Sequence, residues 1–159
     1  MVLDADGLRL AASISGWPEF VPVGSVITPH EGEMAGITGL SLEDVRARRG
    51  EIAAEYAMRW GLTVVLKGAN TLIARPDGEL YINQFSSSAL AHGGTGDVLA
   101  GMVAGFMAQG LGGFEAACCG VWLHSRCAEL ATVAVGHPAS LLPSDLVEVI
   151  GKALQKISE

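Results

Sequence analysis

The sequence predicts an α/β domain in which a mostly parallel sheet is flanked by helices. Short apolar or β-branched runs of strand length alternate with longer segments whose apolar residues recur at helical spacing. Glycines and polar residues follow directly after several of these runs, as they do where open α/β sheets bind ligands at the carboxyl ends of their strands. With 159 residues, the chain fits a single domain, residues 1–159, with a core of reasonable size.

The first element is the end of a buried strand at residues 1–3, followed by a turn and a helix that carries Leu8. Asp4 and Asp6 lie at the carboxyl end of this strand. They either face a ligand there or cap the following helix, and of the two roles we favour capping.

The second strand covers residues 25–28 and stops at Pro29. A loop with His30 follows it and leads into a short helical piece at residues 34–37. His30 is either a ligand contact past the strand end or a solvated, hydrogen-bonded side chain.

A capping-box pattern at Ser41 predicts the start of the next helix, which should run to Gly61. Its apolar residues recur on one face. Arg46, Arg48 and Arg49 lie largely off that face, so we expect them to be solvated.

Residues 62–66 form a nearly continuous apolar run, which is typical of a central strand buried on both sides. Lys67 ends it and is followed by Gly68, so its ammonium either extends outward or lies over an anion. A hairpin then spans residues 71–83, with its turn at residues 76–78.

A small-polar loop, residues 85–92, leads to a glycine turn and an apolar helix that begins near Asp97 and ends at Gly110. We expect Gly101 and Gly105 to allow tight packing of this helix. Glycines before a helix N-terminus favour anion binding, because backbone N–H groups can approach the ligand there. Asp97 is then either an ordinary first-turn acid or a base beside a phosphate.

Two helices complete the chain, one from residue 114 to about 135 and one from Pro143 with Leu146 and Ile157 facing inward. We expect His124 in the first of them to be a satisfied core or interface histidine. The same helix contains three cysteines whose spacing fits no metal site, so we interpret them as buried thiols of a reducing compartment. They are Cys118, Cys119 and Cys127.

The composition is apolar for a domain of this size. Half of the residues are hydrophobic and 17% are charged, where about 25% is usual, so we expect a homo-oligomer or a further segment to cover part of the surface. The net charge of −7 argues against nucleic-acid binding. No apolar run reaches the roughly 18 residues of a membrane span, and no signal-peptide pattern is present, so we expect a cytoplasmic protein without a membrane partner.

Four motifs along the chain resemble one known family. They are VLDADGL at residues 2–8, TPHEGEM at 28–34, VLKGANT at 65–71 and GGTGDVLAG at 93–101, with AQG at 108–110. In this order they resemble the ADP/ATP-dependent NAD(P)H-hydrate dehydratase family. The resemblance implies a ribokinase-like three-layer fold, of which this chain would be the C-terminal part, because family members have a further half before the first motif.

The resemblance also implies a reaction. S-epimer NAD(P)H hydrate would lose water while ADP or ATP, carried with Mg²⁺, loses its terminal phosphate. Carried over by motif, His30 and Asp97 would contact the hydrate, Asp97 also as the base, and no residue would be a dedicated metal ligand. The nucleotide would be held by Lys67, Gly68, Ala69, Asn70, Thr71, Gly94, Thr95 and Gly96.

Two departures from the family pattern lie before the glycine turn. Residues 86–88 are serines where a Gly-Asn pair is usual, and His92 stands where a threonine is usual. Two other functions use the same features. One is a ribokinase-like kinase of a small hydroxylated metabolite, and the other is a non-catalytic nucleotide-binding fragment.

Overall fold

The computed structural model describes residues 1–155 and contains one five-stranded sheet in the order β1-β2-β3-β4-β5. β1 (Val2–Leu3), β2 (Val26–Ile27) and β3 (Thr63–Leu66) are parallel. β4 (Leu72–Ala74) and β5 (Leu80–Ile82) form the predicted antiparallel hairpin, whose β4 strand pairs antiparallel with β3. The sheet is therefore mixed, and the α/β class is confirmed.

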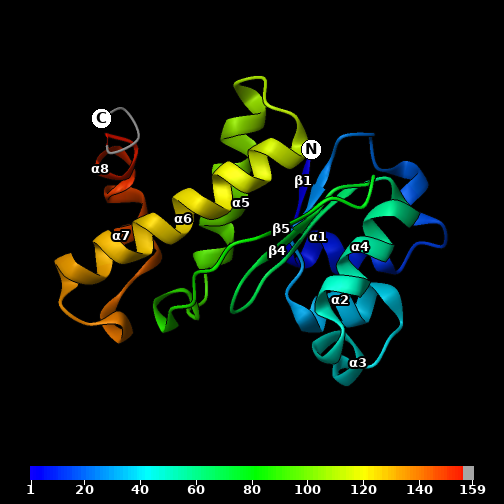
Figure 1. Ribbon diagram of the computed structural model, residues 1–159, viewed down its shortest axis with the longest axis horizontal. Coiled ribbons are helices and arrows are strands. Elements are labelled where there is room, and N and C mark those ends of the chain that lie inside the picture. Colours follow the sequence, from blue (N-terminus) through cyan, green and yellow to red (C-terminus); the bar gives the residue numbers. More distant parts are fainter. Residues whose placement is uncertain (156–159) are drawn as a thin grey trace.

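Helices cover both faces of the sheet (Figure 1). One layer, blue to cyan, consists of α1 (Ala5–Ala12), α2 (Glu31–Thr38), α3 (Leu42–Ala47) and α4 (Arg49–Trp60). The other contains α5 (Thr95–Ala108) and α6 (Gly113–Val135). The molecule thus has three layers with the sheet in the middle.

Alternation along the strands divides the core between the two layers, because successive side chains of a strand point to opposite faces. In β3, Val64 and Leu66 pack with the α1–α4 layer, while Val65 packs with α5 and α6. α7 (Pro143–Glu148) and α8 (Ile150–Gln155) pack against α6 in a further apolar cluster. Short 3₁₀ turns lie at Trp17–Phe20, Ser88–Leu90 and Pro138–Ser140.

Two predicted helices are each divided in the structure. The helix expected to run from Ser41 to Gly61 breaks at Arg48, whose φ of −127° is not helical. The last helix breaks at Val149. Ile157, expected to face inward, lies outside the described residues.

The close approach of α5 to α6 depends on a different glycine from those expected. A Cβ added to Gly101 or Gly105 would meet no neighbouring atom within 4 Å, so the expected tight packing there is wrong. A Cβ on Gly120 of α6 would lie 2.6 Å from Cγ2 of Val103. The close contact is therefore made on the α6 side.

Cys127 is buried, Cys118 and Cys119 are half-buried, and all three are free thiols. Within residues 1–155, no helix combines the length and the apolar character that a membrane crossing requires.

Candidate functional site

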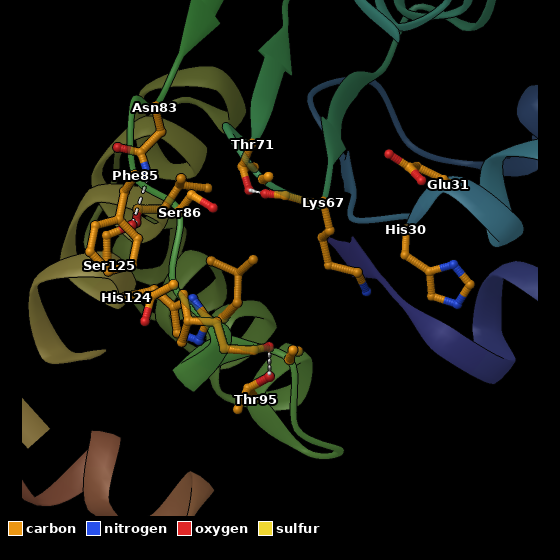
Figure 2. Close-up of a pocket in the computed structure, with 18 of the residues that line it drawn as sticks. His30, Glu31, Lys67, Thr71, Asn83, Phe85, Ser86, Thr95, His124 and Ser125 are labelled. Atoms are coloured by element: carbon orange, nitrogen blue, oxygen red, sulfur yellow. Dashed lines mark hydrogen bonds between the residues drawn. The ribbon is translucent and has the colours of Figure 1, made fainter. Parts of the chain in front are cut away.

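A cleft of about 820 Å³ lies beside the start of α5, the turn after β3 and the start of α2 (Figure 2). Figure 2 shows Lys67 and His30 on one side of it and Phe85, His124 and Ser125 on the other. Seven residues predicted for the site line this cleft. They are His30, Lys67, Gly68, Ala69, Thr71, Thr95 and Gly96.

The glycine turn delivers the start of α5 to the cleft. Gly94 has a φ of +90°, and a Cβ there would lie 2.9 Å from Cγ of Pro143, so both the conformation and the space require glycine. The buried Thr95 hydroxyl lies 2.8 Å from the carbonyl oxygens of Leu90 and His92. Its role in the structure is to fasten the turn to the preceding loop.

The backbone N–H of Thr95 also donates to the carbonyl of His92, at 3.3 Å. Gly96 and Asp97 are the next two residues of the first turn, where N–H groups have no acceptor within the helix. Together with the helix dipole, these donors make the start of α5 suitable for an anion.

Asp97 is exposed in the first turn of α5. Asp97 is not among the residues that line the cleft, and the same holds for Asn70 and Gly94. Asp97 does follow Gly96, whose added Cβ would lie 3.5 Å from both Oδ2 of Asp4 and Nζ of Lys67. Its role as a base stays a prediction.

Lys67 is held by carboxylates from two other elements. Its Nζ lies 2.6 Å from Oδ1 of Asp4 and 3.5 Å from Oε2 of Glu33. Asp4 occupies the N-cap position of α1, but its side chain makes no capping hydrogen bond. The expected capping role is therefore wrong, because the charge-assisted bond to the ammonium takes its place. The pair fixes the ammonium beside the first turn of α5.

His30 is the N-cap of α2 and completes a capping box with Glu33. Its Nδ1 accepts from the Glu33 N–H at 3.1 Å, and Oε2 of Glu33 accepts from the His30 N–H at 2.7 Å. The ring is exposed at the mouth of the cleft. His30 is thus hydrogen-bonded locally and also faces the cleft.

Arg49 organises the turn after β3, a role that sequence reasoning missed by assigning it to a solvated face. Its guanidinium donates to the carbonyl of Ala69 at 2.6 Å and to those of Leu66 and Lys67 at 3.3 Å. Glu31 pairs with it, 3.2 Å from Nε. Gly68 has a φ of +146°, and its added Cβ would lie 2.7 Å from Nη2 of Arg49. The break before α4 brings Arg49 to this turn.

His124 of α6 reaches the opposite wall of the cleft. It is 6% exposed, and its Nε2 has no hydrogen-bond partner within the described part of the chain. The expectation of a core histidine is confirmed, and that of a satisfied one is wrong at Nε2 alone. Burial lowers the pKa of His124 to about 4, with the Thr95 carbonyl opposing the shift and the charge of Lys67 adding to it.

The loop that departs from the family pattern forms part of the same wall. Residues 86–88 and His92 all line the cleft. Oγ of Ser87 accepts from the Ala89 N–H at 3.2 Å and starts a 3₁₀ turn, and His92 contacts the Ala89 carbonyl at 3.1 Å. The departures therefore lie in the lining of the cleft.

Comparisons with known proteins agree on one family. A family model described as NAD(P)H-hydrate dehydratase matches residues 1–152. An ADP-dependent (S)-NAD(P)H-hydrate dehydratase of Neisseria meningitidis serogroup B is 37% identical over 148 residues, which are 92% of this chain and 50% of that protein.

Two solved structures share the fold. The ADP/ATP-dependent NAD(P)H-hydrate dehydratase of Bacillus subtilis, co-crystallised with ATP/Mg²⁺, superimposes with a TM-score of 0.85 at 34% identity, over 98% of this chain and 54% of that one. A ribokinase-like superfamily protein of Enterococcus faecalis V583 gives 0.80 at 28% identity, over 98% and 52%. The chain therefore has a ribokinase-like fold and spans about half the length of each of these three relatives.

Proposed function

Because this chain belongs to the NAD(P)H-hydrate dehydratase family, we propose that its cleft binds ADP or ATP and supports dehydration of the S epimer of NAD(P)H hydrate. The observation that carries the proposal is the convergence on one cleft of the Lys67-Gly68 turn, the first turn of α5 and His30. These elements supply a cation, backbone donors and a polar group at neighbouring positions, as a phosphate ester and its acceptor require.

The proposed reaction transfers the terminal phosphoryl group to the hydroxyl of the hydrate. The hydroxyl oxygen forms a bond to phosphorus, its proton goes to Asp97, and the nucleotide leaves as AMP or ADP. The lone pair of the ring nitrogen then expels the phosphate, and loss of a ring proton restores NAD(P)H. Phosphorylation serves to turn a poor leaving group into a good one.

The residues divide into two groups in this proposal. His30, exposed at the mouth of the cleft, and Asp97, exposed directly after the cleft residue Gly96, contact the hydrate. The second group, from the turn after β3 and the start of α5, holds the nucleotide. It consists of Lys67, Gly68, Ala69, Asn70, Thr71, Gly94, Thr95 and Gly96.

Mg²⁺ fits this arrangement as a partner of the nucleotide. Within residues 1–155, no three His, Cys, Asp or Glu side chains form a set of metal ligands. A magnesium ion bound through phosphate oxygens and water needs no such set, because it retains several waters and uses the phosphates as ligands. When bound, it would neutralise charge on the phosphates, and Lys67 and the α5 N–H groups would position them.

The experiment that tests the function compares products. The chain is incubated with NADH hydrate and ADP, and the absorbance of the reduced nicotinamide is followed. A dehydratase restores this absorbance. A ribokinase-like kinase instead gives a stable phosphorylated alcohol from another substrate, and a non-catalytic fragment binds ADP in a calorimeter without turnover. Either of the latter results would contradict the proposal.

We further propose that the protein is a homo-oligomer and acts in the cytoplasm. Large apolar side chains are exposed in the N-terminal elements, among them Leu10, Phe20 and Val23 with exposed fractions of 66%, 74% and 97%. β1 and β5 are the two edges of the sheet, and all three residues of β5 are exposed. Surfaces of this kind favour association.

A further inference from the structure

Arg46 of α3 lines the cleft, and the proposed reaction does not use it. Its Nε donates to Oε2 of Glu31 at 3.1 Å, and its side chain is 63% exposed. Neither of its Nη groups donates to an acceptor within residues 1–155. A guanidinium that is anchored at Nε keeps the outer donors of its planar fork available for an anion.

Glu31 anchors two arginines at once. Its Oε1 lies 3.2 Å from Nε of Arg49, while its Oε2 accepts from Arg46. The Nη groups of Arg49 bond the carbonyls of the turn after β3, and Arg49 is not among the residues that line the cleft. Two cations thus share one carboxylate, and Arg46 is the member of this group that presents the excess positive charge to the cleft.

Lys67, the other Lys or Arg side chain that lines the cleft in the described part of the chain, has the opposite balance. Its Nζ lies 2.6 Å from Oδ1 of Asp4 and 3.5 Å from Oε2 of Glu33, so one cation meets two carboxylates. A phosphate is attracted most where positive charge is in excess, and the walls of a cleft strengthen this field. The charge distribution therefore favours Arg46 as a further phosphate contact.

Backbone donors lie beside Arg46 at the start of α2. Glu31 and Gly32 are the first two residues of this helix, and both line the cleft. Their N–H groups have no acceptor within the helix, and neither donates to another group among residues 1–155. The N–H of Glu33 differs, because it donates to Nδ1 of His30. A cation and free N–H groups at one helix start are the donors that phosphate sites use.

We propose that Arg46 binds a phosphate group of a ligand in the cleft, at a second phosphate subsite beside the start of α2. In the proposed function two ligands carry such a group, namely the adenine nucleotide and the dinucleotide hydrate, so the identity of the ligand rests on that function. The charges and donors themselves require only a phosphate.

The test measures binding of each ligand separately. Dissociation constants of ADP and of NADH hydrate, each added alone, are determined by calorimetry for the wild-type chain, Arg46→Met, Arg46→Lys and Arg48→Met. Arg48 is the matched control, because it is a neighbouring exposed arginine that does not line the cleft. We expect Arg46→Met to weaken one of the two ligands about tenfold, as the loss of a charge-assisted hydrogen bond would. The other ligand should change less than about threefold.

The ligand that loses affinity identifies the source of the phosphate. Arg46→Lys should recover part of the loss, because it keeps the charge but not the planar fork, and Arg48→Met should leave both constants unchanged. Unchanged constants in Arg46→Met would overturn the inference. An equal loss for both ligands, or the same loss in Arg48→Met, would also overturn it, because either result indicates a general effect of charge or damage to the cleft.

NADH regeneration by the wild-type chain from NADH hydrate and ADP is measured in parallel. Regeneration together with unchanged constants in Arg46→Met removes the Arg46 contact alone. A selective loss of affinity without any regeneration supports the contact and contradicts the proposed function. A wild-type chain that binds neither ligand contradicts both.

Discussion

The position of Asp97 suits two roles of an acid, that of an ordinary first-turn helix residue and that of a catalytic base. It lies in the first turn of α5, where the helix dipole favours a carboxylate, and it follows Gly96 beside the Asp4–Lys67 pair. A first-turn acid contributes only a few tenths of a kcal/mol to about 1 kcal/mol to helix stability. Its removal therefore distinguishes the base from the ordinary helix residue.

We expect Asp97→Asn to abolish turnover while nucleotide binding changes less than about threefold, since an amide keeps the size but cannot accept the proton. The measurement is kcat for NADH-hydrate dehydration beside the ADP dissociation constant from calorimetry. Glu115→Gln, in the first turn of α6, is a control for loss of a helix-terminal charge. Unchanged turnover in Asp97→Asn would exclude Asp97 as the base.

His124 makes stability depend on pH. Its pKa is lowered in the folded state, to about 4 from an ordinary value of 6.5, so the unfolded chain binds more protons between these values. Stability is then fully present above pH 6.5 and decreases as the pH falls toward 4. Urea unfolding at pH 7 and pH 5 should show the wild-type chain losing about 2 kcal/mol more than His124→Phe. An equal loss in both proteins would contradict the lowered pKa.

At the residue scale, the sequence predicted which side chains lie at strand ends but not what each of them contacts. Lys67, His30 and Gly96 line one cleft because their strand ends and helix start are adjacent, which the alternation of elements already indicated. The contact of Asp4 with Lys67 joins residues 63 positions apart. A local capping pattern cannot anticipate such a partner, and the unpartnered Nε2 of His124 likewise depends on how α6 packs.

At the scale of elements, the turn after β3 depends on α4. Arg49 bonds three carbonyls of residues 66–69 and pairs with Glu31, so that one side chain joins α2, α4 and the end of β3. Periodicity placed this arginine off the apolar face and predicted solvent around it. The periodicity of side chains gives no information about the three backbone carbonyls to which Arg49 donates.

We expect Arg49→Met to weaken ADP binding about tenfold and to lower the free energy of unfolding by about 2 kcal/mol, because hydrogen bonds from a charged donor are lost from the turn. Calorimetry and urea unfolding measure the two effects. Arg48→Met is the matched control, since Arg48 is exposed and pairs only loosely with Glu51, at 3.7 Å. Similar losses in both variants would show that Arg49 has no special role in the turn.

The packing of α5 on α6 can be tested by alanine substitutions at two glycines. Alanine usually stabilises a helix relative to glycine by about 1 kcal/mol. We expect Gly105→Ala to follow this rule, because its Cβ would meet open space, and Gly120→Ala to destabilise by about 1–3 kcal/mol, because its Cβ would overlap Val103. Thermal unfolding of the two variants measures the difference. Stabilisation by Gly120→Ala would contradict the close approach.

The positions of strands and helices followed from apolar periodicity, and the hairpin followed from its turn residues. The breaks at Arg48 and Val149 did not, because the nearest glycines, Gly50 and Gly151, lie inside the following helices and not at the breaks themselves. They depend on contacts made after the helices pack. Which glycine lies at the close contact between α5 and α6, Gly120 and not Gly101 or Gly105, likewise depends on how the two helices pack.

At the scale of the whole molecule, the low share of charged residues corresponds to apolar side chains exposed on the surface. Large apolar side chains are exposed in the N-terminal elements, on β5 and along the C-terminal helices, while the cleft lies between the two helical layers. The chain spans about half the length of the dehydratases of Neisseria meningitidis and Bacillus subtilis that it matches, and one cleft contains most of the residues that the family motifs indicate. The central claim is therefore that this chain couples nucleotide cleavage to dehydration.

The most direct test of this claim is the stoichiometry of the reaction. The chain is incubated with NADH hydrate, ADP and Mg²⁺, and NADH and AMP are quantified together over time. Coupled dehydration predicts that NADH and AMP appear in equal amounts and that neither forms when ADP is omitted. AMP without NADH, or no product from a chain that binds ADP, would contradict it.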